Sequence, residues 1–153
     1  MTVSMSYRWE GTPPLTHWDA MKIMSDWSGD VGPQVRDALK AKTPVVTGRM
    51  RATERYAATG FADGVRMEFR AYTNYSEWVI GGARPHIIEA KAARALRWMW
   101  YGHAPGAIAF AKRVHHPGNK PNDFPKEVLD AMKDDITKNL KDRIDAALQG
   151  RSS

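Results

Sequence analysis

The segment Val114–Phe124 (VHHPGNKPNDF) constrains the fold more than any other stretch of this chain. Pro117 and Pro121 each fix φ and remove a backbone donor, while Gly118 can adopt backbone angles that other residues avoid. Because such a stretch cannot continue a helix or a central strand, we expect a rigid loop that ends in the aromatic Phe124. A loop of this kind holds a surface shape, either for a ligand or for a neighbouring subunit.

The chain of 153 residues is long enough for one domain with its own hydrophobic core. It contains no cysteine, which excludes disulfides and thiolate metal sites. No apolar run reaches the ~18 residues of a membrane span, and the N-terminus has no signal-peptide pattern. We therefore expect a soluble protein that is made in the cytoplasm and has no membrane partner.

The net charge of +6 is concentrated in the middle of the chain. Residues 49–120 contain twelve basic and five acidic side chains, whereas the two flanking parts are close to neutral. A basic centre fits binding to nucleic acid, an acidic protein partner, or DNA that passes nearby. Charge alone does not choose among these three.

A long helix is predicted near the N-terminus. Residues 1–14 are polar and end in GTPP, so we expect an N-terminal arm without a core of its own. Thr16 is suited to cap a helix, and apolar residues then recur at helical spacing as far as Lys42. The pair Gly32-Pro33 interrupts this pattern and predicts a kink or a restart of the helix.

Two β-hairpins are predicted from alternating apolar and polar residues. The first joins residues 53–59 to 65–71, and the second joins 96–101 to 107–115 and leads directly into the proline-containing loop. A further short strand is predicted at 85–88. From Pro125 an apolar stripe at helical spacing predicts a second long helix, which Gly150 ends.

These elements predict a single α+β domain over residues 15–149, followed by a C-terminal tail over 150–153. Its fold is a mainly antiparallel sheet of two hairpins, packed by the long N-terminal helix and the C-terminal helix.

The histidines are the first candidates for chemistry. His86, His115 or His116 with Asp123 would suit a zinc ion, but adjacent histidines on a strand point to opposite faces, so hydrogen-bonded loop histidines are the preferred interpretation. The sequence shows no phosphate-binding loop, dinucleotide fingerprint or nucleophile elbow. We therefore predict no enzyme activity, no metal and no cofactor.

A second candidate site is the basic cluster Arg49, Arg51 and Arg55 at the start of the first hairpin. Such a cluster can contact phosphates, or it can be a charged sheet edge that blocks strand pairing. Both long helices are close to neutral, so the sequence offers no basic helix for reading a DNA groove.

Four segments occur here in an order that resembles tailed-phage (siphophage) neck and tail-completion proteins. They are TPVVTGRMR at 43–51, YSEWVIGGARPHII at 75–88, LRW at 96–98, and the loop Val114–Phe124 before a C-terminal helix. The resemblance covers roughly residues 15–148. The sequence departs from the family's usual residues at Met50, Gly82 and Asn119.

The resemblance implies a structural virion protein at the phage head–tail junction. Such a protein forms a homo-oligomeric ring, a hexamer in the implied symmetry, that completes the head-proximal end of the tail and joins it to the capsid connector. Its partners would be itself, adjacent neck proteins, the tail tube protein and, transiently, the passing genomic DNA. Whether this chain is a terminator, a stopper or a tail-completion factor stays open.

On this interpretation, a set of loop residues shapes a subunit or partner interface: Pro85, His86, His115, Pro117, Gly118 and Phe124. If Gly118 adopts a positive φ, replacing it by alanine should disrupt assembly more than folding of the monomer. Arg49, Arg51 and Arg55 would face DNA or an acidic neighbour. The alternative function is a small basic nucleic-acid-binding module, which steeply salt-dependent DNA affinity would favour. A metal-dependent hydrolase built on the histidines is a third hypothesis.

Overall fold

The computed structural model describes residues 2–8, 15–45, 48–61, 64–99 and 107–149. The predicted tail over 150–153 and the stretch 9–14 lie outside the described residues. The elements, in chain order, are β1 (Thr2–Arg8), α1 (His17–Lys42), α2 (Arg49–Thr53), β2 (Glu54–Phe61), β3 (Gly64–Ala71), α3 (Ser76–Gly81), β4 (His86–Glu89), β5 (Leu96–Met99), β6 (Ile108–Ala111), β7 (Arg113–His116) and α4 (Phe124–Gln149). The α+β class is confirmed, but the strands form three small antiparallel sheets instead of one.

Helix α1 begins where the sequence predicts. Thr16 is its N-cap, and the Thr16 hydroxyl oxygen accepts a hydrogen bond from the backbone N–H of Asp19 at 3.2 Å. The apolar stripe is buried along its length, with Trp27 and Val35 completely inaccessible to solvent. The helix ends at Lys42, with Thr43 as its C-cap. The next residue is Pro44, and a proline disfavours helical backbone angles in the residue before it.

Helix α1 continues through Pro33 as one element, so the predicted restart does not occur. Proline lacks the N–H that would bond to the Gly29 carbonyl. One turn away, the Tyr56 hydroxyl of β2 donates a hydrogen bond to the Ser28 carbonyl, and the Tyr56 ring covers Gly32. Tertiary contacts from the sheet therefore support the helix at its weakest point.

The close approach of Tyr56 to Gly32 gives a testable expectation. A Cβ atom at position 32 would lie 2.1 Å from the Tyr56 ring. We expect Gly32→Ala to lower the free energy of unfolding by about 1–3 kcal/mol, because the added carbon overpacks a filled contact. Urea unfolding checks this, with Gly29→Ala as the control, since a Cβ at position 29 meets nothing within 4 Å. Equal stability of the two variants would contradict it.

The main sheet has the strand order β1-β3-β2, with both pairings antiparallel. Its central strand β3 alternates as predicted, with Val65, Met67, Phe69 and Ala71 buried. The first predicted hairpin is thus confirmed. The prediction of a coreless arm was wrong for residues 2–8, because β1 pairs with β3 along its whole length and Met5 packs against the core.

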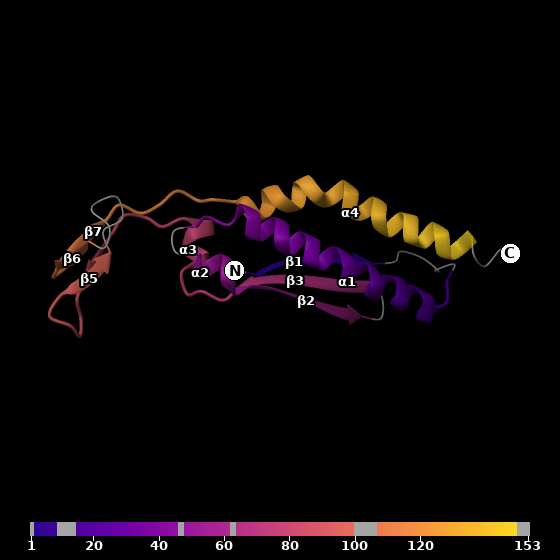
Figure 1. Cartoon of the computed structure of the whole chain (residues 1–153), viewed down its shortest axis with the longest axis horizontal. Helices are drawn as coiled ribbons and strands as arrows, with labels where there is room; N and C mark the ends of the chain where they lie inside the picture. Colours follow the sequence, from indigo (N-terminus) through magenta and orange to yellow (C-terminus); the bar gives the residue numbers. More distant parts are fainter. Residues whose placement is uncertain (1, 9–14, 46–47, 62–63, 100–106, 150–153) are drawn as a thin grey trace.

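Helix α1 lies between the main sheet and α4 (Figure 1). Side chains of α4 complete the core from the far side, among them Val128, Ile136 and Leu140. Arg143 of α4 donates a 2.6 Å hydrogen bond to the Asp30 carboxylate of α1, which ties the two helices together. No helix in the described part of the chain is apolar over a length that could cross a membrane.

The remaining strands form a projection, which we define as residues 86–116. It extends away from the helices at the left of Figure 1. β5 and β6 form the second predicted hairpin, but the predicted return strand 107–115 is split at Lys112. Its second half, β7, pairs with β4 in a separate two-stranded sheet. The sequence predicted that these segments are strands, but not that β7 pairs with β4 while β6 pairs with β5.

Candidate functional site

The proline-containing loop joins the projection to α4 and packs on the segment that follows α3. Gly118 and Gly82 have φ of +78° and +77°, a region that favours glycine. Between them, Ala83 and Asn119 form an isolated antiparallel bridge with two backbone hydrogen bonds, each 3.0 Å long. Gly118 meets the condition of a positive φ, which allows the backbone of the loop to approach Ala83 closely.

Asn119 fixes the loop from its side chain as well. Its Nδ2 donates to the Trp78 carbonyl of α3 at 2.8 Å, and the Asn122 N–H donates to the Ile80 carbonyl at 3.0 Å. Sequence analysis named Asn119 only as a departure from the family's usual residue and gave no role to Asn119 or Trp78. An asparagine directly after Gly118 in a loop was the available signal, because its side chain can hydrogen-bond to the backbone of a turn.

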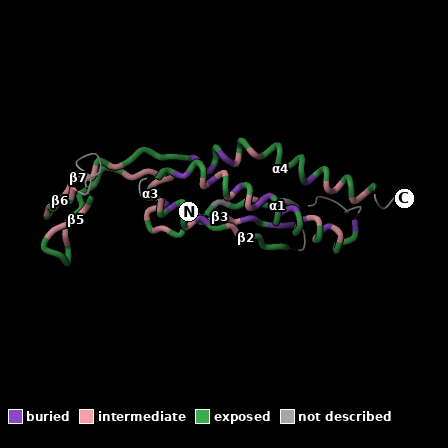
Figure 2. Tube along the Cα trace, viewed as in Figure 1, coloured by how far each residue is buried: buried purple, intermediate pink, exposed green. Residues whose placement is uncertain are grey.

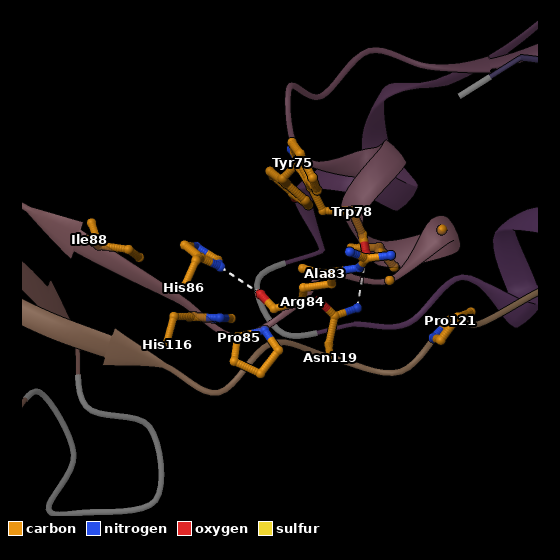
Figure 3. A pocket seen from close by; sticks show the side chains of 13 residues that line it. Tyr75, Trp78, Ala83, Arg84, Pro85, His86, Ile88, His116, Asn119 and Pro121 are labelled. Atoms are coloured by element: carbon orange, nitrogen blue, oxygen red, sulfur yellow. Dashed lines mark hydrogen bonds between the residues drawn. The ribbon is translucent and has the colours of Figure 1, made fainter.

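His86 and His116 are cross-strand partners with ring centroids 4.9 Å apart (Figure 3). His86 Nδ1 is 2.9 Å from the Arg84 carbonyl, which can only accept, so Nδ1 carries the proton. His116 Nδ1 accepts the Gly118 N–H at 3.1 Å and is therefore unprotonated. The hydrogen bonds set different tautomers on the two rings, in keeping with the prediction of hydrogen-bonded loop histidines.

His115 lies opposite Ile87 and is exposed, so the two adjacent histidines occupy opposite faces of β7 as expected. The structure therefore brings together two of the three histidines considered for a metal. Within the described residues, no three His, Asp or Glu side chains come close enough together to hold a metal ion.

An open groove of about 1020 Å³ runs past this loop junction. Figure 3 shows Trp78, Pro85 and the two paired histidines around it. Trp78 is 60% exposed although it is a large aromatic side chain. The full lining is Tyr75, Trp78, Val79, Gly81, Gly82, Ala83, Arg84, Pro85, His86, Ile88, His116, Asn119 and Pro121. Aromatic and proline rings of this kind suit an apolar protein segment more than a small polar ligand.

The predicted interface residues divide into two groups. Pro85 and His86 line the groove, and Gly118 shapes the loop beside it. Pro117 and His115 are exposed and do not line the groove. We call the main sheet with helices α1, α2 and α4 the body. Phe124 differs from the other predicted interface residues, because only 2% of its surface is exposed and it belongs to the core of the body. Its predicted place at an interface was wrong: it anchors the start of α4 beneath the loop.

The arginine cluster lies elsewhere, since Arg49 and Arg51 belong to α2 and Arg55 to β2. Arg51 donates to the Thr43 carbonyl at 3.2 Å, and Arg55 donates to the Ala52 and Glu54 carbonyls at 2.9 and 3.0 Å. These two guanidinium groups are thus hydrogen-bonded to backbone carbonyls of their own chain. None of the three arginines lines the groove.

Glu54, beside this cluster, is buried at the start of β2. The Thr43 hydroxyl donates to one carboxylate oxygen, and the other has no hydrogen-bond partner among the described residues. Burial raises the pKa of Glu54, although the Thr43 hydrogen bond and the nearby Lys40 and Arg51 act in the opposite direction. The net result is a carboxyl group that binds its proton more tightly in the folded state than in the unfolded chain.

Stability should therefore depend on the ionisation of Glu54. Because the raised pKa favours protonation of the folded state, the contribution of Glu54 to stability falls as pH rises from the ordinary carboxyl range towards neutrality. We expect the stability of Glu54→Gln relative to the wild type to increase over this range, by about 1.4 kcal/mol per unit of raised pKa. Urea unfolding of both proteins from pH 4 to 7 checks this; parallel stability curves would contradict it.

The described residues of the projection, 86–99 and 107–116, form no core of their own. None of them is buried, and Figure 2 shows them without the buried class that runs through the body. One face of the β5–β6 hairpin exposes Met99 (53%), Ile108 (44%) and Phe110 (65%). Met99 lies opposite Ile108, and the exposed Arg97 lies opposite Phe110 on the same face. Sequence analysis missed this apolar face. The sequence did carry a signal for it: the short predicted hairpin has apolar residues on both faces, because Leu96 and Trp98 occupy the face opposite to Met99, Ile108 and Phe110.

Comparison with known proteins identifies no relative: no family model matches the sequence, and neither a curated protein nor a solved structure matches the chain.

Proposed function

We propose that this chain is a structural virion protein of the head–tail junction of a tailed phage. It forms a homo-oligomeric ring, six-fold in the symmetry that the resemblance implies, which completes the head-proximal end of the tail and joins it to the capsid connector. The role requires no catalysis and no cofactor. The sequence resemblance supplies the biological setting, and the geometry of the projection supports the assembly.

The observation that carries the proposal is the coreless projection. A two-stranded hairpin is marginally stable in water, and burial of apolar surface is the main driving force for folding and association. Here two such sheets leave Ile87, Met99, Ile108 and Phe110 exposed. A neighbouring copy that covers this face would complete a core that the monomer lacks.

The chain also offers a second, different surface for such a contact. Helix α3 lies at the base of the projection, whereas β5 and β6 lie at its far end (Figure 1). The groove is lined by the exposed Trp78 of α3, and β5 and β6 carry the exposed apolar side chains. A closed ring is built from contacts between two unlike surfaces, each presented by every subunit. We therefore propose that the Met99–Ile108–Phe110 face of one copy packs against the Trp78 groove of the next.

The test is the mass and shape of the protein in solution, by light scattering and negative-stain imaging, alone and mixed with the tail tube protein of the same phage. We expect a mass several times that of the 17.2 kDa chain, ring-shaped particles, or rings bound at the ends of tubes. A protein that stays monomeric in both samples and does not bind tube ends would contradict the proposal.

A further inference from the structure

The positive charge of this protein is confined largely to one part of the fold. Residues 82–123 contain seven Lys or Arg and two Asp or Glu side chains, which accounts for five of the six net positive charges. Helices α1 and α4 and the main sheet, taken together, are nearly neutral. The projection and its base therefore carry most of the net positive charge of the chain, whereas the two long helices and the main sheet together carry very little.

Four cations lie on or next to the two segments that connect the small sheets of the projection: Lys91 and Arg94 between β4 and β5, Lys112 between β6 and β7, and Arg113 at the start of β7. The Ala90 N–H donates to the Lys112 carbonyl at 3.0 Å, which places the β4–β5 connection beside the junction of β6 and β7. All four side chains are exposed. We call these four residues the cationic cluster.

The cationic cluster is poorly neutralised. Arg113 approaches Glu89 at 3.5 Å, and both groups are more than half exposed, so this pair is weak. Lys91, Arg94 and Lys112 have no carboxylate partner within the described residues. Like charges at close range repel one another, and an external polyanion would relieve that repulsion.

The residues between these cations indicate which polyanion fits. Lys91 and Arg94 are separated and flanked by alanines in the run AKAARA, without a large apolar side chain among them. Protein interfaces are depleted of lysine and gain their affinity from large buried side chains, whereas DNA affinity comes mainly from cations on phosphates. The cluster therefore suits a phosphate backbone more than an acidic protein surface.

We infer that the cationic cluster at Lys91, Arg94, Lys112 and Arg113 binds the phosphate backbone of double-stranded DNA without reading its sequence. The inference rests on the proposed function for its biological role, since a ring at the head–tail junction encloses the path of the genome. It moves the DNA-contacting site from Arg49, Arg51 and Arg55, where the sequence suggested it, to the projection.

The experiment compares DNA binding of three full-length proteins by fluorescence anisotropy, using a labelled 30-base-pair duplex over a series of salt concentrations. One variant carries Lys91→Ala, Arg94→Ala and Lys112→Ala. The matched control carries Lys133→Ala, Lys138→Ala and Lys141→Ala, which removes the same charge from exposed positions of α4. The solution mass of all three proteins is measured in parallel.

We expect the wild type and the α4 control to bind the duplex alike. We expect the cluster variant to bind at least about tenfold more weakly at 0.1 M salt, with a salt slope smaller by about 3. Equal losses in both variants, or no binding of DNA by the wild type, would overturn the inference; the latter result would favour an acidic protein partner. The solution mass reports assembly separately from DNA binding. If the wild type stays monomeric and DNA affinity is lost only in the cluster variant, the proposed ring is refuted and the DNA-binding site is supported.

Discussion

Replacing Phe110 by serine is expected to abolish assembly while leaving the monomer folded. Phe110 is 65% exposed and belongs to the apolar face at the end of the projection, so its loss removes little from the core of the body. An aromatic side chain at the centre of an interface contributes about 2 kcal/mol or more to the binding free energy. Its removal therefore weakens each subunit contact at least about 30-fold. Light scattering over a range of protein concentrations measures the change in mass.

The control for this variant is Trp18→Ser, because Trp18 is 83% exposed and lies on α1 in the body. It removes an exposed aromatic side chain of similar size without touching the projection. We expect Trp18→Ser to assemble as the wild type does, and both variants to unfold in urea at the wild-type midpoint. Assembly lost in both variants, or in Trp18→Ser alone, would contradict a role specific to the projection.

Replacing Gly118 by alanine is expected to detach the base of the projection from α3. The new Cβ atom would lie 2.2 Å from the Ala83 carbonyl oxygen, and alanine disfavours the observed φ of +78°. Strain of this kind is worth about 1–3 kcal/mol, so the Ala83–Asn119 bridge should open about 5- to 140-fold more often. Amide hydrogen exchange at Ala83 and Asn119 reports the opening directly.

This change should affect assembly more than folding of the body, because the bridge lies outside the buried cluster of α1, β3 and α4. Gly29→Ala is the control: Gly29 lies on α1, outside the groove, and a Cβ there meets nothing within 4 Å. A Gly118→Ala protein that forms wild-type rings would refute the claim that this loop shapes a subunit contact.

The parts of the fold that the sequence predicts well are those governed by local rules. Thr16 caps α1 because its hydroxyl can reach the N–H of Asp19, and the alternation along β3 reflects one face turned towards α1. The two long helices follow from apolar stripes of ordinary width. Each of these signals depends on residues close together in the chain.

The errors arise where distant contacts decide the structure. Residues 2–8 alternate the apolar Val3, Met5 and Tyr7 with polar residues, a strand signal that sequence analysis passed over. They form β1 by pairing with the edge of β3, which is distant in the sequence. Helix α1 passes through Gly32-Pro33 because Tyr56, more than twenty residues away, packs on Gly32. Phe124 follows a loop in the sequence, yet the body buries it.

The candidate site could be predicted only in part. Proline and glycine indicated a rigid loop, and the structure shows Gly118 at positive φ beside Ala83. The groove, by contrast, requires α3 to lie against the loop, and no local pattern reports that contact. The sequence likewise does not reveal that the described part of the projection lacks a core. Alternating apolar residues predict that one face of a strand is covered, but not whether the same chain or a neighbouring copy covers it.

The most direct test of the central claim is the structure of the assembled particle by electron cryomicroscopy, alone or on the end of a tail tube. The proposal predicts that the Met99–Ile108–Phe110 face of each copy is buried in the Trp78 groove of its neighbour, so that no copy leaves Phe110 exposed to solvent. A ring held together by the body alone, with the projections exposed, would contradict it.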